Sequence, residues 1–138
     1  MYKLLVVPND GFRLYESGVL ETASVYQYAL QYGNTTGTAN GEAKSTAKDR
    51  MPSFNNTGGD GDLNGYCYFY NLGDSSKYSF LTHHNFSVQG GGAINSYYYE
   101  FGSAVLSQAS TVDGIQYVQD ITSGIVAGTF SLYGIAES

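Results

Sequence analysis

The sequence has no tryptophan, one cysteine, two prolines and few charged residues. Charged side chains make up 13% of the 138 residues, well below the roughly 25% of an average soluble domain. Because Cys67 is the single cysteine, no disulfide can form within the chain. No apolar run approaches the roughly 20 residues that a membrane-spanning helix needs. These absences argue against a disulfide-stapled scaffold and predict no membrane partner.

Basic residues are also scarce, with six Lys and Arg against twelve Asp and Glu, for a formal net charge of −6. Binding to nucleic acid depends on clustered Lys and Arg that neutralise phosphates. The one grouping of basic residues, Lys44, Lys48 and Arg50, is typical of a solvated loop. We therefore expect no nucleic-acid partner.

The N-terminal stretch "MYKLLVVPND" has one lysine and a four-residue apolar run that ends at Pro8. A secretory signal needs a longer apolar core, of about 7–15 residues. The sequence thus predicts a protein made in the cytosol, which either stays there or leaves as part of a larger particle.

Aromatic residues and glycine are plentiful instead: aromatics make up 15% of the chain, and there are 14 tyrosines and 18 glycines. This composition is typical of a β-rich protein with many turns. A chain of this length folds most simply as one domain, residues 1–138, with a core of its own.

Alternating side-chain character predicts about eight short strands separated by Gly/Asn/Asp turns. In residues 22–32, Tyr26, Tyr28, Leu30 and Tyr32 fall on one face at a period of two. We therefore predict an all-β fold, an antiparallel β-sandwich of jelly-roll type. The other predicted strands are 3–7, 12–20, 66–71, 78–88, 97–107, 115–121 and 128–135, with a turn at 113–114.

Residues 33–65 are rich in Gly, Asn, Thr and Ser, and only Met51 and Phe54 are large apolar anchors. The composition predicts one long loop, a feature that is usually functional or disordered. It would be an extended arm on a neighbouring subunit, a mobile tip, or a loop that holds a brief helix near residues 42–50.

Within that loop, Asp60, Asp62 and Asn64 have the spacing of the first three ligands of a calcium loop. The twelfth position is Asn71, which cannot supply the bidentate carboxylate that completes such a site. Asp, Asn and Gly are also the residues that any exposed turn prefers. We interpret the stretch as a turn that enters a strand and predict no metal or cofactor, with the calcium loop as the alternative.

No arrangement of residues predicts catalysis. On a strand, His83 and His84 point to opposite faces, so they cannot converge on one ion. Cys67 lies in an alternating aromatic run, where a packed, inert thiol is expected. The chain contains neither a Gly-x-Ser-x-Gly elbow nor a phosphate-binding loop. The sequence therefore predicts a protein that is not an enzyme.

The C-terminal stretch "GIQYVQDITSGIVAGTFSLYGIAES", residues 114–138, resembles the ending of a group of small tailed-bacteriophage virion proteins. Those chains end in a Ser-Gly-Asn bend followed by a Gly-Thr-Phe-x-Leu-Tyr-Gly-Ile strand. Residues 128–135 match the strand and Ser123-Gly124 matches the bend, whereas Ile125 replaces the asparagine. Residues 24–32, "SVYQYALQY", more weakly resemble an early strand of the same group.

The resemblance implies a virion structural protein made in the cytoplasm of a bacterial host. The most concrete expectation is a capsid decoration (cement) protein that binds the major capsid protein and itself, as a homotrimer. The alternatives are a tail, neck or head-fibre component, a carbohydrate-binding module that stacks tyrosines on sugars, and, more distantly, a small hydrolase. The residues expected to contact partners are Met51, Phe54, Tyr97, Tyr98 and Tyr99.

Overall fold

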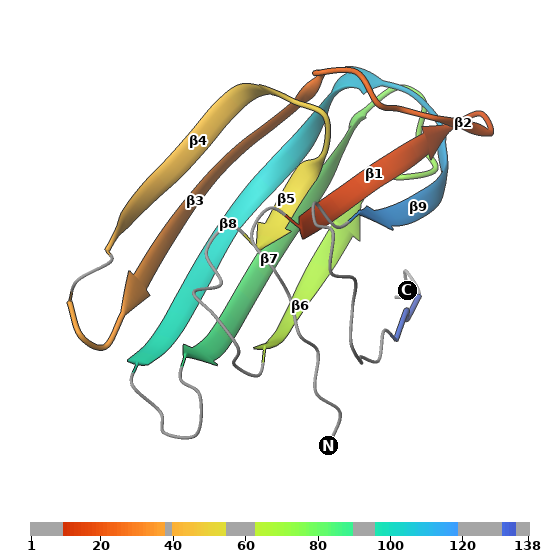
Figure 1. Cartoon of the computed structure of the whole chain (residues 1–138). Coiled ribbons are helices and arrows are strands. Elements are labelled where there is room, and N and C mark those ends of the chain that lie inside the picture. The colour runs from red at the N-terminus through yellow and green to blue at the C-terminus, as the bar shows by residue number, and fades with distance from the viewer. Residues whose placement is uncertain (1–9, 38–39, 55–62, 90–95, 119–130, 135–138) are drawn as a thin grey trace.

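The computed structural model describes residues 10–37, 40–54, 63–89, 96–118 and 131–134. Within these ranges, nine strands form two antiparallel sheets that lie against each other (Figure 1). This arrangement confirms the predicted antiparallel β-sandwich. No helix in the described part of the chain is long and apolar enough to cross a membrane.

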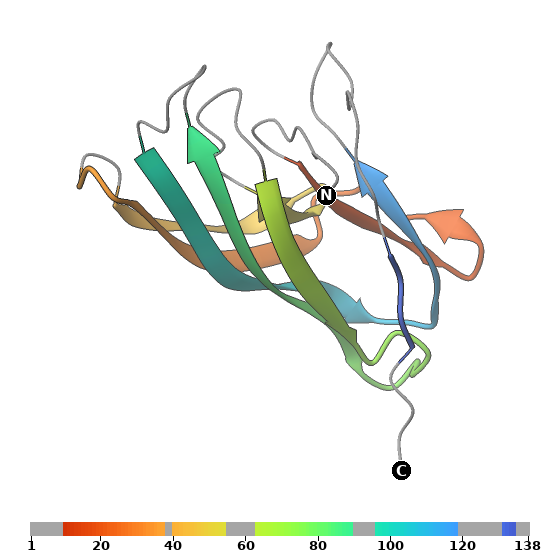
Figure 2. The same cartoon turned by 90° about the horizontal axis from the view of Figure 1, so that it is seen from below.

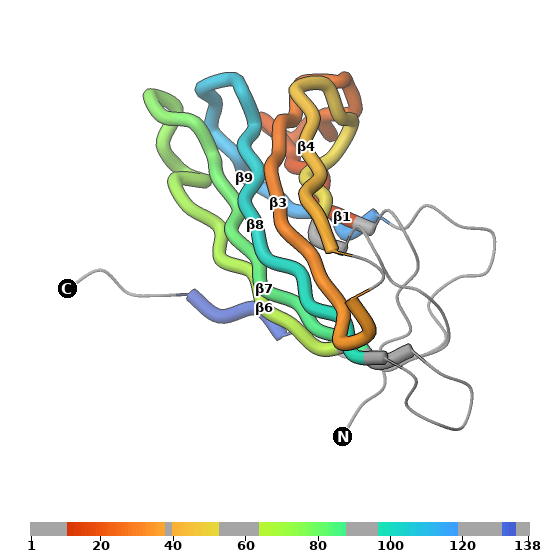
Figure 3. Tube along the Cα trace, turned by 90° about the vertical axis from the view of Figure 1, so that its left-hand side faces the viewer, coloured from red at the N-terminus to blue at the C-terminus, as the bar shows by residue number. Residues whose placement is uncertain are grey.

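The larger sheet has five strands in the order β4-β3-β8-β7-β6, which Figure 3 shows side by side. Strands β6, β7 and β8 are consecutive antiparallel neighbours, and β8 also pairs with β3. The sheet therefore joins a three-stranded meander to the β3–β4 hairpin. Its strands are β3 (Tyr26–Asn34), β4 (Gly41–Lys48), β6 (Leu63–Tyr70), β7 (Tyr78–Gln89) and β8 (Ser96–Ala109).

The smaller sheet is built around β1 (Asp10–Glu16). Strand β9 (Val112–Val118) pairs along most of β1, while β5 (Met51–Phe54) and β2 (Val19–Leu20) pair with its first and last residues. The turn between β1 and β2 has positive φ at both Ser17 and Gly18, as tight hairpins require. Residues 12–20 are thus a hairpin and not the single strand that the sequence predicted.

The core lies between the two sheets. Strands β1 and β5 contribute Leu14 and Met51, which pack against residues of the larger sheet. Burying a side chain of this size stabilises the fold by about 1.5–3 kcal/mol. The fully or almost fully buried members are Leu14, Tyr26, Met51, Leu81, Ala104, Leu106 and Val112.

The connection from β4 to β5 carries the chain from one sheet to the other and is held by charge pairs. Asp49 forms ion pairs with Arg50, at 3.0 Å, and with Arg13 of β1. The Arg13 Nε also donates a hydrogen bond to the Asp49 carbonyl at 3.0 Å. Partial burial on its own raises the pKa of Asp49, but the hydrogen bonds from Arg50 and Arg13 outweigh it and hold that pKa below its usual value.

The prediction of one long loop over residues 33–65 is wrong. Strands β4 and β5 occupy residues 41–48 and 51–54, and the brief helix expected near 42–50 is a strand. The segment has few large apolar residues because β4 is an edge strand that is largely exposed to solvent. Its order comes from pairing with β3, a tertiary contribution that overrides local composition.

Two further predictions need correction. Asp113 and Gly114, expected in a turn, lie inside β9. Residues 131–134, expected in the final strand, are not in a strand. The remainder of that predicted strand, and the predicted strand 3–7, lie outside the described residues.

Candidate functional site

The outer face of the five-stranded sheet is the most distinctive surface of the molecule. The smaller sheet covers only the other face, as the view in Figure 2 shows. Side chains alternate between the two faces of a strand. In β7 every second residue is buried, so Phe80 and Phe86 point outward; the buried residues are Ser79, Leu81, His83, Asn85 and Ser87.

Aromatic side chains dominate this outer surface, which we call the aromatic face. Eight Phe and Tyr side chains on it are between 38% and 55% exposed, and an exposed histidine lies among them. The members come from three adjacent strands, so they form one continuous surface. The aromatic face consists of Tyr66, Tyr68, Tyr70, Phe80, His84, Phe86, Tyr97, Tyr99 and Phe101.

Contacts between the rings hold the aromatic face in place. The centroids of Tyr66 and His84 are 5.8 Å apart, and those of His84 and Phe101 are 6.4 Å apart. Tyr99 stacks on Phe101 at 6.3 Å with an interplanar angle of 13°. Ring pairs at such distances attract each other beyond simple burial. The rings are therefore ordered before any partner arrives, which lowers the entropic cost of binding.

The size of the aromatic face is unusual for a monomer. An aromatic side chain presents roughly 150–250 Å² in total, so eight of them at about 40–50% exposure leave roughly 700 Å² open to solvent. The largest apolar patch on a typical monomer is about 300–600 Å². A standard protein–protein interface buries about 800 Å² per partner. The area is thus that of a binding surface.

The aromatic face is almost free of charge. On β6, β7 and β8 no Asp, Glu, Lys or Arg points outward, because Glu100 is buried on the inner face. Charged residues lie at its borders: Glu42 and Lys44 on β4 pair with each other at 3.1 Å, and Asp74 and Lys77 in the turn between β6 and β7 pair at 2.9 Å. Aromatic sheets that stack nucleic-acid bases also need cations to hold the backbone. Two lysines at its borders, each paired with a carboxylate, make this face a poor nucleic-acid surface.

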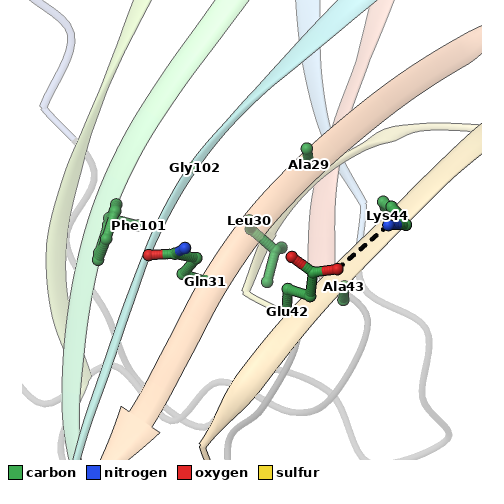
Figure 4. Close-up of a pocket in the computed structure, with 8 residues that line it drawn as sticks. All are labelled: Ala29, Leu30, Gln31, Glu42, Ala43, Lys44, Phe101 and Gly102. Atoms are coloured by element: carbon green, nitrogen blue, oxygen red, sulfur yellow. Dashed lines mark hydrogen bonds and ion pairs between the residues drawn. The ribbon is translucent and has the colours of Figure 1, made fainter.

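A shallow depression of about 220 Å³ lies beside the aromatic face, between β8, β3 and β4 (Figure 4). Phe101 forms one end of it, the Gln31 side chain points toward that ring, and the Glu42–Lys44 pair lies at the other end. Typical small-molecule pockets are about 300–1,000 Å³. The depression is therefore smaller than a pocket that encloses a cofactor, and its polar groups border the face.

On the inner face of the same sheet, three neighbouring residues are of the types found in a catalytic site: Cys67, His83 and Glu100. Cys67 is directly opposite His83 in the β6–β7 pairing, and His83 Nε2 lies 3.2 Å from Glu100 Oε1. A cysteine hydrolase needs these three residue types in this order. However, burial raises the pKa of the Cys67 thiol to about 11, and an activated cysteine requires a lowered one. His83 and Glu100 are buried. We therefore interpret Cys67, His83 and Glu100 as polar residues of the core.

The predicted partner-contacting residues are only partly brought together. Tyr97 and Tyr99 lie on the aromatic face, whereas Tyr98 is half-buried on the other side of β8. The choice of Met51 was wrong, because its side chain is 0% exposed and packs in the core. Phe54 lies in β5 opposite Asp10, and its side chain is outside what the structure describes.

Sequence reasoning missed most of the aromatic face. Alternation in residues 66–70 and 78–88 was recognised, and it places Tyr66, Tyr68 and Tyr70 on one side. Periodicity alone does not say which side is outward. Polarity, the other available signal, points to the wrong side: His83, Asn85 and Ser87 alternate with aromatic residues, and the polar set is the buried one.

Of the alternative calcium ligands, Asp60 and Asp62 lie outside the described residues. Asn64 lies in β6 and is exposed. In the part of the chain that the structure describes, no three His, Cys, Asp or Glu side chains come together as a metal site.

No protein-family model, curated protein or solved structure matches the chain. The similarity of residues 114–138 to phage virion proteins therefore stays a prediction. The physical case for function rests on the aromatic face.

Proposed function

We propose that this chain is a non-enzymatic structural protein of a bacteriophage virion, a capsid decoration (cement) protein that docks through its aromatic face. The observation that carries the proposal is an ordered aromatic surface of roughly 700 Å², close to the per-partner area of a standard interface. The phage assignment itself rests on the sequence of residues 114–138. The partner is the major capsid protein, and the protein acts as a homo-oligomer, most simply a trimer at a threefold junction.

The composition of the aromatic face favours a protein partner. Tyrosine and phenylalanine are enriched at the centres of interfaces, whereas charged residues are depleted there. Five of the eight exposed Phe and Tyr rings are tyrosines, which combine a large apolar area with a hydroxyl for hydrogen bonding. The net charge of −6 is carried elsewhere, so docking buries little charge.

Cement function also requires a rigid platform. The face is a continuous sheet whose strands β7 and β8 pair over twelve residue positions. Its opposite side is fixed by the core and by the Arg13–Asp49 tie between sheets. A capsid bound to such a rigid platform would be cross-linked between its own subunits, and the decoration protein would not deform.

The test is co-sedimentation of the purified full chain with mature, tail-less phage heads, with unexpanded precursor heads as the control. Saturable binding to mature heads alone supports the decoration role. Binding to isolated tails instead moves the protein to the tail or neck, and binding to neither particle contradicts the virion proposal.

Carbohydrate binding is the second candidate, favoured by the depression in Figure 4. There the Phe101 ring lies beside Gln31, Glu42 and Lys44, which offer donors and acceptors for sugar hydroxyls. Binding of the chain to host surface polysaccharide, abolished by Gln31→Ala and Phe101→Ala separately, would support this function.

A further inference from the structure

Strand β6 forms one end of the five-stranded sheet and has β7 as its only pairing partner within the described residues. Its sequence, "LNGYCYFY", contains neither a charged residue nor proline. Natural sheets protect exposed edges with Lys, Pro or charges, because an open edge pairs readily with another strand. The β6 edge has no such protection.

The opposite end of the same sheet is built differently. Strand β4 carries Glu42, Lys44 and Lys48 along a largely exposed edge. Charges of this kind oppose pairing with another chain. The contrast between the two edges singles out β6 as the site where a strand can be added.

A candidate strand lies in the C-terminal segment, residues 131–134. Leu132 and Tyr133 are 85% and 82% exposed, the highest values among the large apolar side chains that the structure describes. Residues 131–134 are in no strand, although the sequence predicts one over residues 128–135. Figure 2 shows residues 131–134, in dark blue, on the β6 side of the molecule. Burial against a second copy would remove the Leu132 and Tyr133 side chains from solvent.

We propose that the C-terminal segment of one copy adds as a strand to the β6 edge of a second copy. The alternation of side chains matches on both faces. With a period of two, Tyr133 joins the outward row of Tyr66 and Tyr68, and Leu132 points inward beside Phe69. Main-chain hydrogen bonds supply affinity in this mode of recognition, and alternate side chains supply specificity.

Strand donation defines how copies assemble. Each copy presents one donor segment and one acceptor edge made of different residues, so each contact is heterologous and the copies form a closed ring when the rotation permits. A ring of three copies would be the trimer of the proposed function. The inference rests on the proposed function only for the number of copies, three. Assembly in solution, without phage heads, tests strand donation separately from capsid binding.

The experiment measures the mass of the full chain and of a variant lacking residues 131–138 by light scattering across a concentration series. We expect the full chain to form a discrete oligomer and the truncated chain to be monomeric. Hydrogen exchange then locates the contact. The β6 amides should exchange roughly tenfold or more slowly in the full chain than in the truncated one.

Controls are built into the same measurement. Amides of β4, the charged edge, should exchange equally in both chains, and unchanged protection of β3 and β8 shows that the truncated chain is folded. A synthetic peptide of residues 126–138 should bind the truncated chain and restore β6 protection, whereas a scrambled peptide should not. A monomeric full chain, or an oligomer that survives truncation, overturns the proposal.

Discussion

The hydroxyl oxygen of Tyr26 accepts a hydrogen bond from the backbone N–H of Leu14 at 3.0 Å. The same hydroxyl donates to the Glu21 carbonyl at 3.2 Å. Tyr26 belongs to the five-stranded sheet and Leu14 to the smaller one, so one buried phenol joins the two layers. Burial raises the pKa of Tyr26 from 10.0 to about 12, so the hydroxyl stays protonated and able to donate even in moderately alkaline solution.

Replacing Tyr26 with Phe tests this tie. The variant leaves the buried Leu14 N–H without its acceptor, so we expect a loss of about 1–2 kcal/mol in the free energy of unfolding. Urea denaturation measures it. Tyr28→Phe is the control, because its hydroxyl makes no hydrogen bond to another described residue, and it should change stability far less. Equal losses in the two variants would show that the bond contributes nothing specific.

Asp49 should make stability depend on pH. Its folded pKa lies below 3.8, the ordinary value, so the stabilisation is fully present above that pH and is lost as the pH falls through the folded pKa. At neutral pH, Asp49→Asn should cost about 1–2 kcal/mol, discounted for partial exposure.

Urea titrations from about pH 2 to pH 7 measure this dependence for the wild type and for Asp49→Asn. The difference between them should shrink toward zero at the acid end. Asp113→Asn, which changes an exposed carboxylate with no ion pair among the described residues, is the control. A difference that stays constant with pH would exclude the carboxylate charge as its source.

Gly102 allows β3 and β8 to approach closely. A Cβ at this position would lie 2.5 Å from the Leu30 Cβ and 2.6 Å from the Ala29 carbonyl oxygen. Backbone atoms cannot move aside easily, so Gly102→Ala should destabilise the fold by about 1–3 kcal/mol. Gly73→Ala is the control, since nothing lies within 4 Å of its added Cβ. Thermal unfolding that is equal in both variants would contradict the close approach.

The thiol of Cys67 should react slowly. Burial raises its pKa from 9.0 to about 11, so its thiolate fraction near pH 8 falls roughly a hundredfold. Iodoacetamide should therefore modify the folded protein far more slowly than the protein unfolded in urea. Rapid modification of the folded chain would indicate an activated thiol and would reopen the comparison of Cys67, His83 and Glu100 with a hydrolase site.

The sequence predicted the sandwich because its long strands carry strong local signals. Tyr26, Tyr28 and Leu30 alternate over β3, and the aromatic runs of β6 and β7 do the same. Strand β4 was missed because an exposed edge strand needs few apolar residues and is specified by its pairing partner. Strand β5 was missed because it has only four residues and pairs only with the first residues of β1. Composition alone cannot reveal a partner that is distant in sequence.

The candidate site was harder to predict than the fold. Tyr97 and Tyr99, two of the residues expected to contact partners, face outward, whereas Met51 was expected to do so because it and Phe54 are isolated large apolar residues in a polar stretch. That isolation reflects its place in β5, where it is the residue that packs into the core. The aromatic face reverses the usual pattern, with Ser79, His83 and Asn85 inside and rings outside. The smaller sheet decides which side of the five-stranded sheet is covered. Its position cannot be predicted from the sequence.

The central claim is that the aromatic face is the surface that docks on the capsid. It is tested most directly by measuring the affinity of the double variant Phe86→Thr/Phe101→Thr for mature heads. Threonine keeps the strand propensity while removing the rings, and Val19→Thr on β2 is the matched control outside the face. We predict that the double variant loses roughly tenfold or more in affinity, with an unchanged fold, whereas the control binds as the wild type does. Wild-type affinity in the double variant would contradict the claim.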